Sequence, residues 1–148
     1  MKNIKLSTIT LIISIICILS SCSSPKVMHS VGKLNDIDLR FNVSMNSSKF
    51  PNNPYTDNTP QMLSLSVTNL DPNKTFNGSL KDNVPQKAVV NLTFLLSGDL
   101  VVEQRVELSN MQVSPLVTSQ EQTVVLYLPK KKKIKELMSV DVSYVDLY

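Results

Sequence analysis

The chain has little of the side-chain chemistry from which active sites are built. Its 148 residues include two cysteines, one histidine, three glycines and no tryptophan. No glycine-rich phosphate loop, nucleophile elbow or histidine–carboxylate metal spacing is present. Carboxylates such as Asp36 and Asp38, or Glu103 and Glu107, recur at strand spacing on the expected solvent face and do not suggest an acid–base pair. The sequence therefore predicts neither an enzyme nor a cofactor or metal site.

The longest apolar run lies at the N-terminus. Lys2 and Lys5 precede a nearly unbroken apolar segment from Ile9 to Leu19, and this order is typical of a secretory signal peptide. The segment is too short to span a bilayer comfortably, since spanning takes about 20 apolar residues. We therefore expect residues 1–21 to be a leader that is removed.

A cysteine follows this run directly. The stretch Leu19-Ser20-Ser21-Cys22 resembles the bacterial lipobox, which implies a mature protein that begins at a lipidated Cys22. Two or three acyl chains anchor a protein stably, whereas one anchors it only marginally. Ser23 stands where an aspartate would often retain a lipoprotein in the inner membrane, so the resemblance favours the outer membrane, facing the periplasm. The alternative is a plain secreted chain with an incidental cysteine.

Cysteine and charge counts restrict the mature chain. Cys17, the only other cysteine, lies inside the leader, so neither a disulfide nor a cysteine-type zinc site is expected, and stability has to come from packing. Loss of Lys2 and Lys5 would leave 13 basic residues against 12 acidic ones. A balance so close to neutral gives no electrostatic footprint for nucleic acid, which we do not expect as a partner.

The rest of the chain divides into two parts. Residues 22–34 show no sustained periodicity and are predicted to be the lipidated N-terminus and a flexible tether. His29 lies in this segment and is expected to be solvated. Residues 35–148 have a suitable length for a single domain with one core.

Apolar and polar residues alternate with a period of two in several segments of this domain, which is typical of half-buried strands. These segments are residues 37–45 ("IDLRFNVSM"), 63–67, 100–108, 123–129 and 139–145. Residues 88–96 ("AVVNLTFLL") are apolar on both faces and would also suit a short buried helix, although the valines and Phe94 favour a strand. Residues 46–60 and 69–86 are rich in turn-forming residues. We predict an all-β fold, a two-sheet antiparallel β-sandwich.

The only concentrated charge is the run Lys130–Lys133, just after Pro129. One interpretation is attraction to anionic lipid headgroups. The other, which we favour from sequence alone, is a solvated turn between two strands, where lysines also discourage edge-to-edge aggregation.

Three segments resemble the TssJ family, the outer-membrane lipoproteins of type VI secretion systems. They are "IDLRFNVSM" as the first strand, Pro60 followed by "MLSLSVTNLDPNKTF" with Leu70, Asp71 and Phe76, and "VDVSYVDLY" with Val140, Val142, Tyr144, Asp146 and Leu147. The chain departs from the family at Thr68 or Asn69, which replace an aromatic residue, and at Val145, which replaces an arginine. The proline-glycine turn that precedes the late strands of the family is also not found.

The resemblance implies a transthyretin-like sandwich and a structural role. The domain would be held in the outer membrane by Cys22 and would bind the periplasmic part of an inner-membrane secretion component of the TssM type. In the family, the loop joining the first two strands is part of that contact. The corresponding loop here is "NSSKFPNNPYTDNTP", in which we expect Phe50, Pro54, Tyr55 and Asp57 to bind the partner. Phe50 and Tyr55 could instead fold back over the edge of the core.

Two other functions remain open at this stage. The chain could be a lipid-anchored periplasmic inhibitor that blocks a foreign hydrolase with a loop. It could also be a pilotin-like chaperone that escorts a secretin to the membrane. All three are binding functions, and an enzyme is the least expected class.

Overall fold

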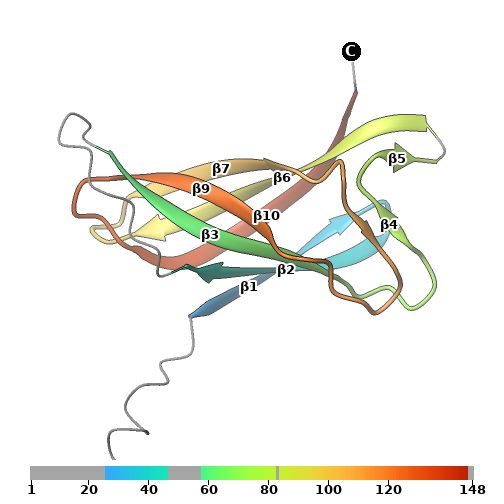
Figure 1. Cartoon of the computed structure of the whole chain (residues 1–148), viewed down its shortest axis with the longest axis horizontal. Helices are drawn as coiled ribbons and strands as arrows, with labels where there is room; N and C mark the ends of the chain where they lie inside the picture. Colours follow the sequence, from blue (N-terminus) through green and yellow to red (C-terminus); the bar gives the residue numbers. More distant parts are fainter. Residues whose placement is uncertain (1–25, 47–57, 83, 147–148) are drawn as a thin grey trace, which may run out of the picture.

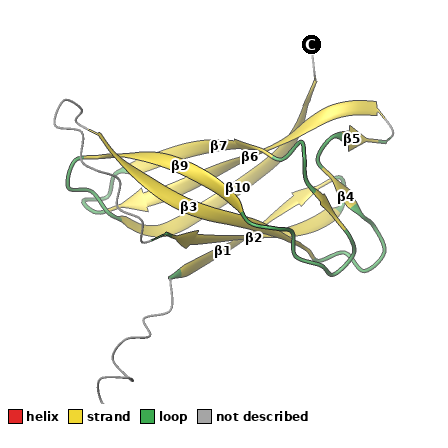
Figure 2. Ribbon diagram, in the orientation of Figure 1, coloured by secondary structure: helices red, strands yellow, loops and turns green. Residues whose placement is uncertain are grey.

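The computed structural model describes residues 26–46, 58–82 and 84–146, which form β-strands joined by turns and loops, with no helix among them (Figures 1 and 2). The strands are β1 (Val27–Leu34), β2 (Ile37–Met45), β3 (Asn58–Asn69), β4 (Phe76–Asn77), β5 (Leu80–Lys81), β6 (Val84–Leu96), β7 (Val101–Glu107), β8 (Gln112–Val113), β9 (Gln122–Pro129) and β10 (Ile134–Asp146).

Two antiparallel sheets make up the body of the molecule. The first has the strand order β1-β2-β3-β9, and the second has β10-β6-β5, with β7 also paired to β6. The short strands β4 and β8 form a separate ribbon. Every pair is antiparallel, which confirms the predicted all-β fold with antiparallel sheets.

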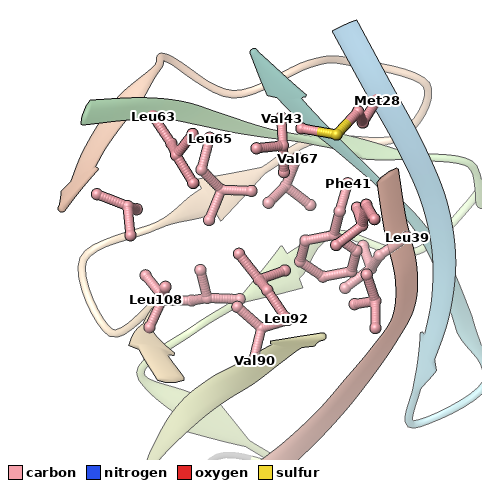
Figure 3. Packing of buried hydrophobic residues seen from close by; sticks show 14 of the residues in the cluster. Met28, Leu39, Phe41, Val43, Leu63, Leu65, Val67, Val90, Leu92 and Leu108 are labelled. Carbon is pink, nitrogen blue, oxygen red and sulfur yellow. The ribbon is translucent and has the colours of Figure 1, made fainter. Parts of the chain in front are cut away.

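The core lies between the two sheets. Figure 3 shows Leu65 and Val67 of β3 pointing towards Val90 and Leu92 of β6. The core cluster consists of aliphatic side chains, three phenylalanines and Met28. Its largest fully buried side chains are Phe41, Phe76, Phe94, Leu39, Leu63, Leu65, Leu92, Leu96 and Leu108. Burying such a side chain stabilises the fold by about 1.5–3 kcal/mol.

The predicted strands are present. Residues 37–45 form β2 over the predicted range. Residues 63–67, 123–129 and 139–145 lie within β3, β9 and β10, and β7 covers residues 101–107 of the predicted 100–108. Residues 88–96 belong to the strand β6, not to a helix. The inward positions Ala88, Val90, Leu92, Phe94 and Leu96 are buried, and the outward positions 91, 93 and 95 are partly exposed, so burial in this segment follows the period of a strand.

The tether prediction is wrong for residues 27–34, which form the strand β1. Its inner positions are Met28, Ser30, Gly32 and Leu34, and the small residues at Ser30 and Gly32 conceal the period of two. Gly32 is needed because β1 passes close to the second sheet. A Cβ at this position would lie 2.8 Å from Val142 Cγ2 and 3.4 Å from Phe41 Cε2.

A two-residue turn joins β1 to β2. Asn35 and Asp36 both have left-handed backbone dihedrals, with φ of 47° and 60°, and Leu34 pairs with Ile37. Positive φ at both central residues is the geometry of a type I′ hairpin turn, which Asn and Asp tolerate better than most residues. His29 consequently lies in a strand rather than in a tether, although its side chain is exposed.

The extra strand changes the position of the long polar loop. The segment around residues 46–60 joins the second and third strands, not the first and second as we expected, and its last residues, from Asn58, already belong to β3. Residues 69–86 also contain two short strands, β4 and β5, and the beginning of β6.

Candidate functional site

The residues that the sequence singles out for function lie outside the described part of the chain. They are Cys22, Phe50, Pro54, Tyr55 and Asp57. The structure does describe Lys26, four positions after Cys22, and Asn46 and Asn58, which flank residues 47–57. These residues fix where the segment before β1 and the β2–β3 connection leave the sandwich.

Both segments leave at the same end. Val27, at the start of β1, pairs with Ser44 near the end of β2. Asn58, at the start of β3, pairs with Pro129 at the end of β9. We call this the proximal end: it carries Lys26, the flanks of the β2–β3 connection, the β6–β7 turn and the β9–β10 turn (left side of Figure 1). The opposite, distal end carries the Asn35-Asp36 turn and the ribbon of β4 and β8.

Two turns are tied together at the proximal end. Ser97 N donates a hydrogen bond to Lys133 O over 2.8 Å, and Lys133 N donates to Ser97 Oγ over 3.1 Å. Lys135 Nζ lies 3.1 Å from Asp99 Oδ1. The lysine run is therefore a turn between β9 and β10, as the sequence analysis favoured, and it is attached to the neighbouring β6–β7 turn.

An apolar patch lies on the outer face of the first sheet near the proximal end. It consists of Pro60 and Met62 from β3 with Val125 and Tyr127 from β9, since Pro60 pairs with Tyr127 and Met62 with Val125. Tyr127 is 64% exposed, and the other three are partly exposed. We call these four residues the outer patch. An exposed tyrosine among apolar neighbours is the kind of side chain that anchors protein interfaces.

Sequence reasoning missed the outer patch. Residues 123–129 ("TVVLYLP") alternate as predicted, and Val124, Leu126 and Leu128 are buried. Val125 and Tyr127 occupy the opposite phase, where a purely structural strand would carry polar residues. These two apolar residues in outward positions were the sequence signal for an exposed patch. The sequence could not show that they lie beside Pro60 and Met62, because that follows from the pairing of β9 with β3.

A row of polar side chains crosses the same outer face nearer its middle. Asn42 Nδ2 donates to Thr68 Oγ1 over 3.1 Å, and Thr68 Oγ1 lies 2.9 Å from Thr118 Oγ1. This orientation places Asn42 Oδ1 2.8 Å from His29 Nδ1. The row links β1, β2 and β3 with the segment that precedes β9, and it gives His29 a structural hydrogen bond rather than a carboxylate partner suited to catalysis.

A polar pocket of about 800 Å³ opens between the edges of the two sheets where β7 faces β9. Its lining residues are Glu107, Ser109, Asn110, Met111, Gln112, Thr118, Ser119, Gln120, Glu121 and Gln122. Gln122 Nε2 crosses the opening and donates to Glu107 O over 3.4 Å. The lining offers the carboxylates of Glu107 and Glu121 and several neutral hydrogen-bonding side chains, which suit a polar ligand.

The described residues contain no cluster of three or more histidine, cysteine or acidic side chains placed to hold a metal ion. Over residues 26–46, 58–82 and 84–146, no helical segment has the length and apolar character needed to cross a bilayer.

Several residues that carry the family resemblance have structural roles. Phe76 is fully buried in the core. Asp71 Oδ1 accepts hydrogen bonds of 2.8 Å from the backbone N–H groups of Asn73 and Lys74, and these bonds hold the pKa of the Asp71 carboxyl below its usual value. Tyr144 Oη lies 2.7 Å from Asn77 O and 3.0 Å from Leu80 O. Partial burial, with the nearby Asp82 charge, raises the pKa of Tyr144.

Comparison with known proteins gives no assignment. No protein-family model matches the chain, and neither the curated proteins nor the solved structures contain a significant match.

Proposed function

We propose that the chain is an outer-membrane lipoprotein with an assembly role in an envelope-spanning secretion complex. Acylated Cys22 would hold the sandwich at the membrane. The proximal end would bind the periplasmic part of an inner-membrane component, in the manner of TssJ and a TssM-type partner in type VI secretion. The transthyretin-like topology that this resemblance implies stays a prediction.

The observation that carries the proposal is the exposed outer patch at the proximal end. Tyr127 and Val125 lie beside Pro60 and Met62. The strand β3 begins at Asn58, two residues before Pro60, and the β2–β3 connection ends there. The outer patch thus lies near Asn58, the first described residue after the β2–β3 connection. An exposed tyrosine among apolar neighbours favours a protein partner over a small polar ligand.

The anchor and this surface would lie close together. Lys26 is the first described residue and lies four positions after Cys22, a span of at most about 14 Å when fully extended. A partner that binds the proximal end must then reach the immediate vicinity of the outer membrane. That requirement suits a long periplasmic domain attached to the inner membrane.

Co-purification of the full-length lipoprotein from detergent-solubilised envelopes tests the proposal. We expect the wild type to retain an inner-membrane secretion component identified by mass spectrometry. Tyr127→Ser should reduce that retention by roughly 30-fold, the effect of losing a hot spot worth about 2 kcal/mol. Val31→Ser is the matched control, because Val31 is 55% exposed on β1 of the same sheet and lies away from the outer patch.

Other outcomes would replace the proposal. Retention of a hydrolase would favour the inhibitor function, and retention of a secretin would favour the pilotin-like function. Equal retention of the partner by the wild type and by Tyr127→Ser would show that the outer patch does not bind it.

A further inference from the structure

We propose that the lysines at the proximal end form a membrane-facing surface that contacts anionic lipid headgroups. The lysine cluster consists of Lys26, Lys130–Lys133 and Lys135. This inference rests on the proposed acylation of Cys22 and adds a second, electrostatic contact between the domain and the same membrane.

The fold gives the lysine run a fixed shape. Lys132 N donates to Pro129 O over 3.0 Å, which closes the turn, and Lys131 has a left-handed φ of 66°. Lys130, Lys131 and Lys133 are exposed and Lys132 is partly exposed. Because the turn is also bonded to Ser97, its lysines are presented by a defined backbone, and contact with a surface orders little more than their side chains.

The position of Lys26 places the cluster beside the anchor. Lys26 Nζ donates a 2.6 Å hydrogen bond to Lys135 O, although the two residues are 109 positions apart in sequence. The lipid-bearing end of the chain therefore approaches the sandwich next to the strand that follows the lysine run. With Cys22 in the bilayer, the short span from Cys22 to Lys26 keeps this part of the domain within about 14 Å of the attachment point.

The lysine run is not neutralised within the domain. Among residues 26–46, 58–82 and 84–146 the ion pairs are Lys33–Asp36, Lys87–Glu107 and Lys135–Asp99, and none of them involves Lys130–Lys133. Near the run, Asp99 is paired with Lys135 and Glu136 is exposed. Positive charge thus collects at one end of a chain whose mature net charge is expected to be near neutral, which fits an anionic surface better than nucleic acid.

The position of Lys130–Lys133 near the proposed anchor favours contact with lipid headgroups over a merely solvated turn. Electrostatic attraction to a membrane falls off within a Debye length, about 8 Å at physiological ionic strength. A lysine turn at the distal end would have been too far from the bilayer to be attracted. At the proximal end each lysine increases attraction to an anionic surface about fivefold, so three lysines contribute on the order of a hundredfold.

The experiment reconstitutes the mature full-length lipoprotein into vesicles. A fluorescent label on Leu100→Cys reports on the proximal end, and the same label on Val84→Cys reports on the distal end. Both positions are partly exposed, at 39% and 56%, and with Cys22 acylated the mature chain has no other thiol to react. Quenching by headgroup-labelled lipid is compared in phosphatidylcholine vesicles and in phosphatidylcholine–phosphatidylglycerol vesicles.

We expect stronger quenching of the Leu100→Cys label when phosphatidylglycerol is present. In 1 M salt, where the Debye length is about 3 Å, this gain should disappear. The variant Lys130→Gln/Lys132→Gln/Lys133→Gln should lose the gain as well, and it leaves the left-handed Lys131 in place. The control Lys33→Gln/Lys74→Gln/Lys81→Gln removes the same charge from the distal end and should keep the gain.

Failure of this inference and failure of the proposed function give different results. If the protein floats with both kinds of vesicle but its proximal label is quenched equally in both, the lysine turn is only solvated and the inference is overturned. A triple variant that keeps the phosphatidylglycerol gain overturns it too. If the protein does not float with either vesicle, Cys22 carries no anchor, and the proposed function fails together with the inference.

Discussion

Asn69 shows at the scale of one residue how a polar group stabilises an aliphatic core. Its side chain is fully buried, and its amide Nδ2 donates to Lys74 O over 2.7 Å and to Val113 O over 3.0 Å. Its Oδ1 accepts from Asp71 N over 3.0 Å. The buried amide is thus hydrogen-bonded through both its donor and its acceptor, and it connects the end of β3 with the following loop and with β8.

Asn69→Ala should lower the free energy of unfolding by about 1–3 kcal/mol, because it leaves buried backbone groups without partners. Urea denaturation followed by circular dichroism measures the change. Asn73→Ala is the control, since Asn73 is exposed in the same loop, and its effect should stay within about 0.5 kcal/mol. Equal effects of the two substitutions would show that the buried amide contributes no more than an exposed one.

Asp71 predicts a pH dependence. Its carboxylate accepts backbone hydrogen bonds from Asn73 and Lys74, so its pKa in the folded protein lies below the ordinary value of 3.8. A lowered pKa gives stability that is present above the unfolded pKa and is lost as the pH falls through the folded pKa. The wild type should therefore exceed Asp71→Asn in urea midpoint near neutral pH, and the difference should close below pH 3.8. A difference independent of pH would rule out this role of the charge.

At the scale of strands, residues with clear alternation could be predicted and residues without it could not. Residues 37–45 alternate strictly between large apolar and polar side chains, and they form β2. The strand β1 was missed because Ser30 and Gly32 occupy inward positions where large apolar residues would be expected. Its turn, Asn35-Asp36, was a usable signal, since this dipeptide suits a type I′ hairpin.

Gly32→Val tests whether close packing, and not chain flexibility, requires a glycine in β1. Its side chain would collide with Val142 and Phe41, and overpacking of this kind costs about 1–3 kcal/mol. The midpoint of thermal or urea unfolding should fall accordingly. Val31→Ala, one residue away on the exposed face, should change stability by less than about 0.5 kcal/mol. An unchanged midpoint for Gly32→Val would mean that β1 does not pack as the structure indicates.

At the scale of the whole molecule, the arrangement of the two ends depends on strand pairing that the sequence does not specify. The lysine run and the segment before β1 are separated by about a hundred residues, yet Lys26 bonds to Lys135. Likewise the outer patch exists only because Pro60 pairs with Tyr127 and Met62 with Val125. Sequence patterns identified the lysine run and the strands around it, whereas only the strand pairing shows that the run lies at the same end of the sandwich as the start of β1.

This arrangement gives a single physical account of the molecule. At one end, the described part of the sandwich carries the start of β1, the basic turn between β9 and β10, and the exposed outer patch. The proposed function and the proposed lipid contact both depend on this end being held at a membrane.

Intact-mass spectrometry of the protein purified from its native envelope tests that dependence most directly. The account predicts a chain that begins at Cys22, with residues 1–21 removed and an added mass equal to a diacylglycerol group and an N-linked acyl chain. A chain that retains its leader, or one that begins near residue 22 without fatty acids, would contradict it.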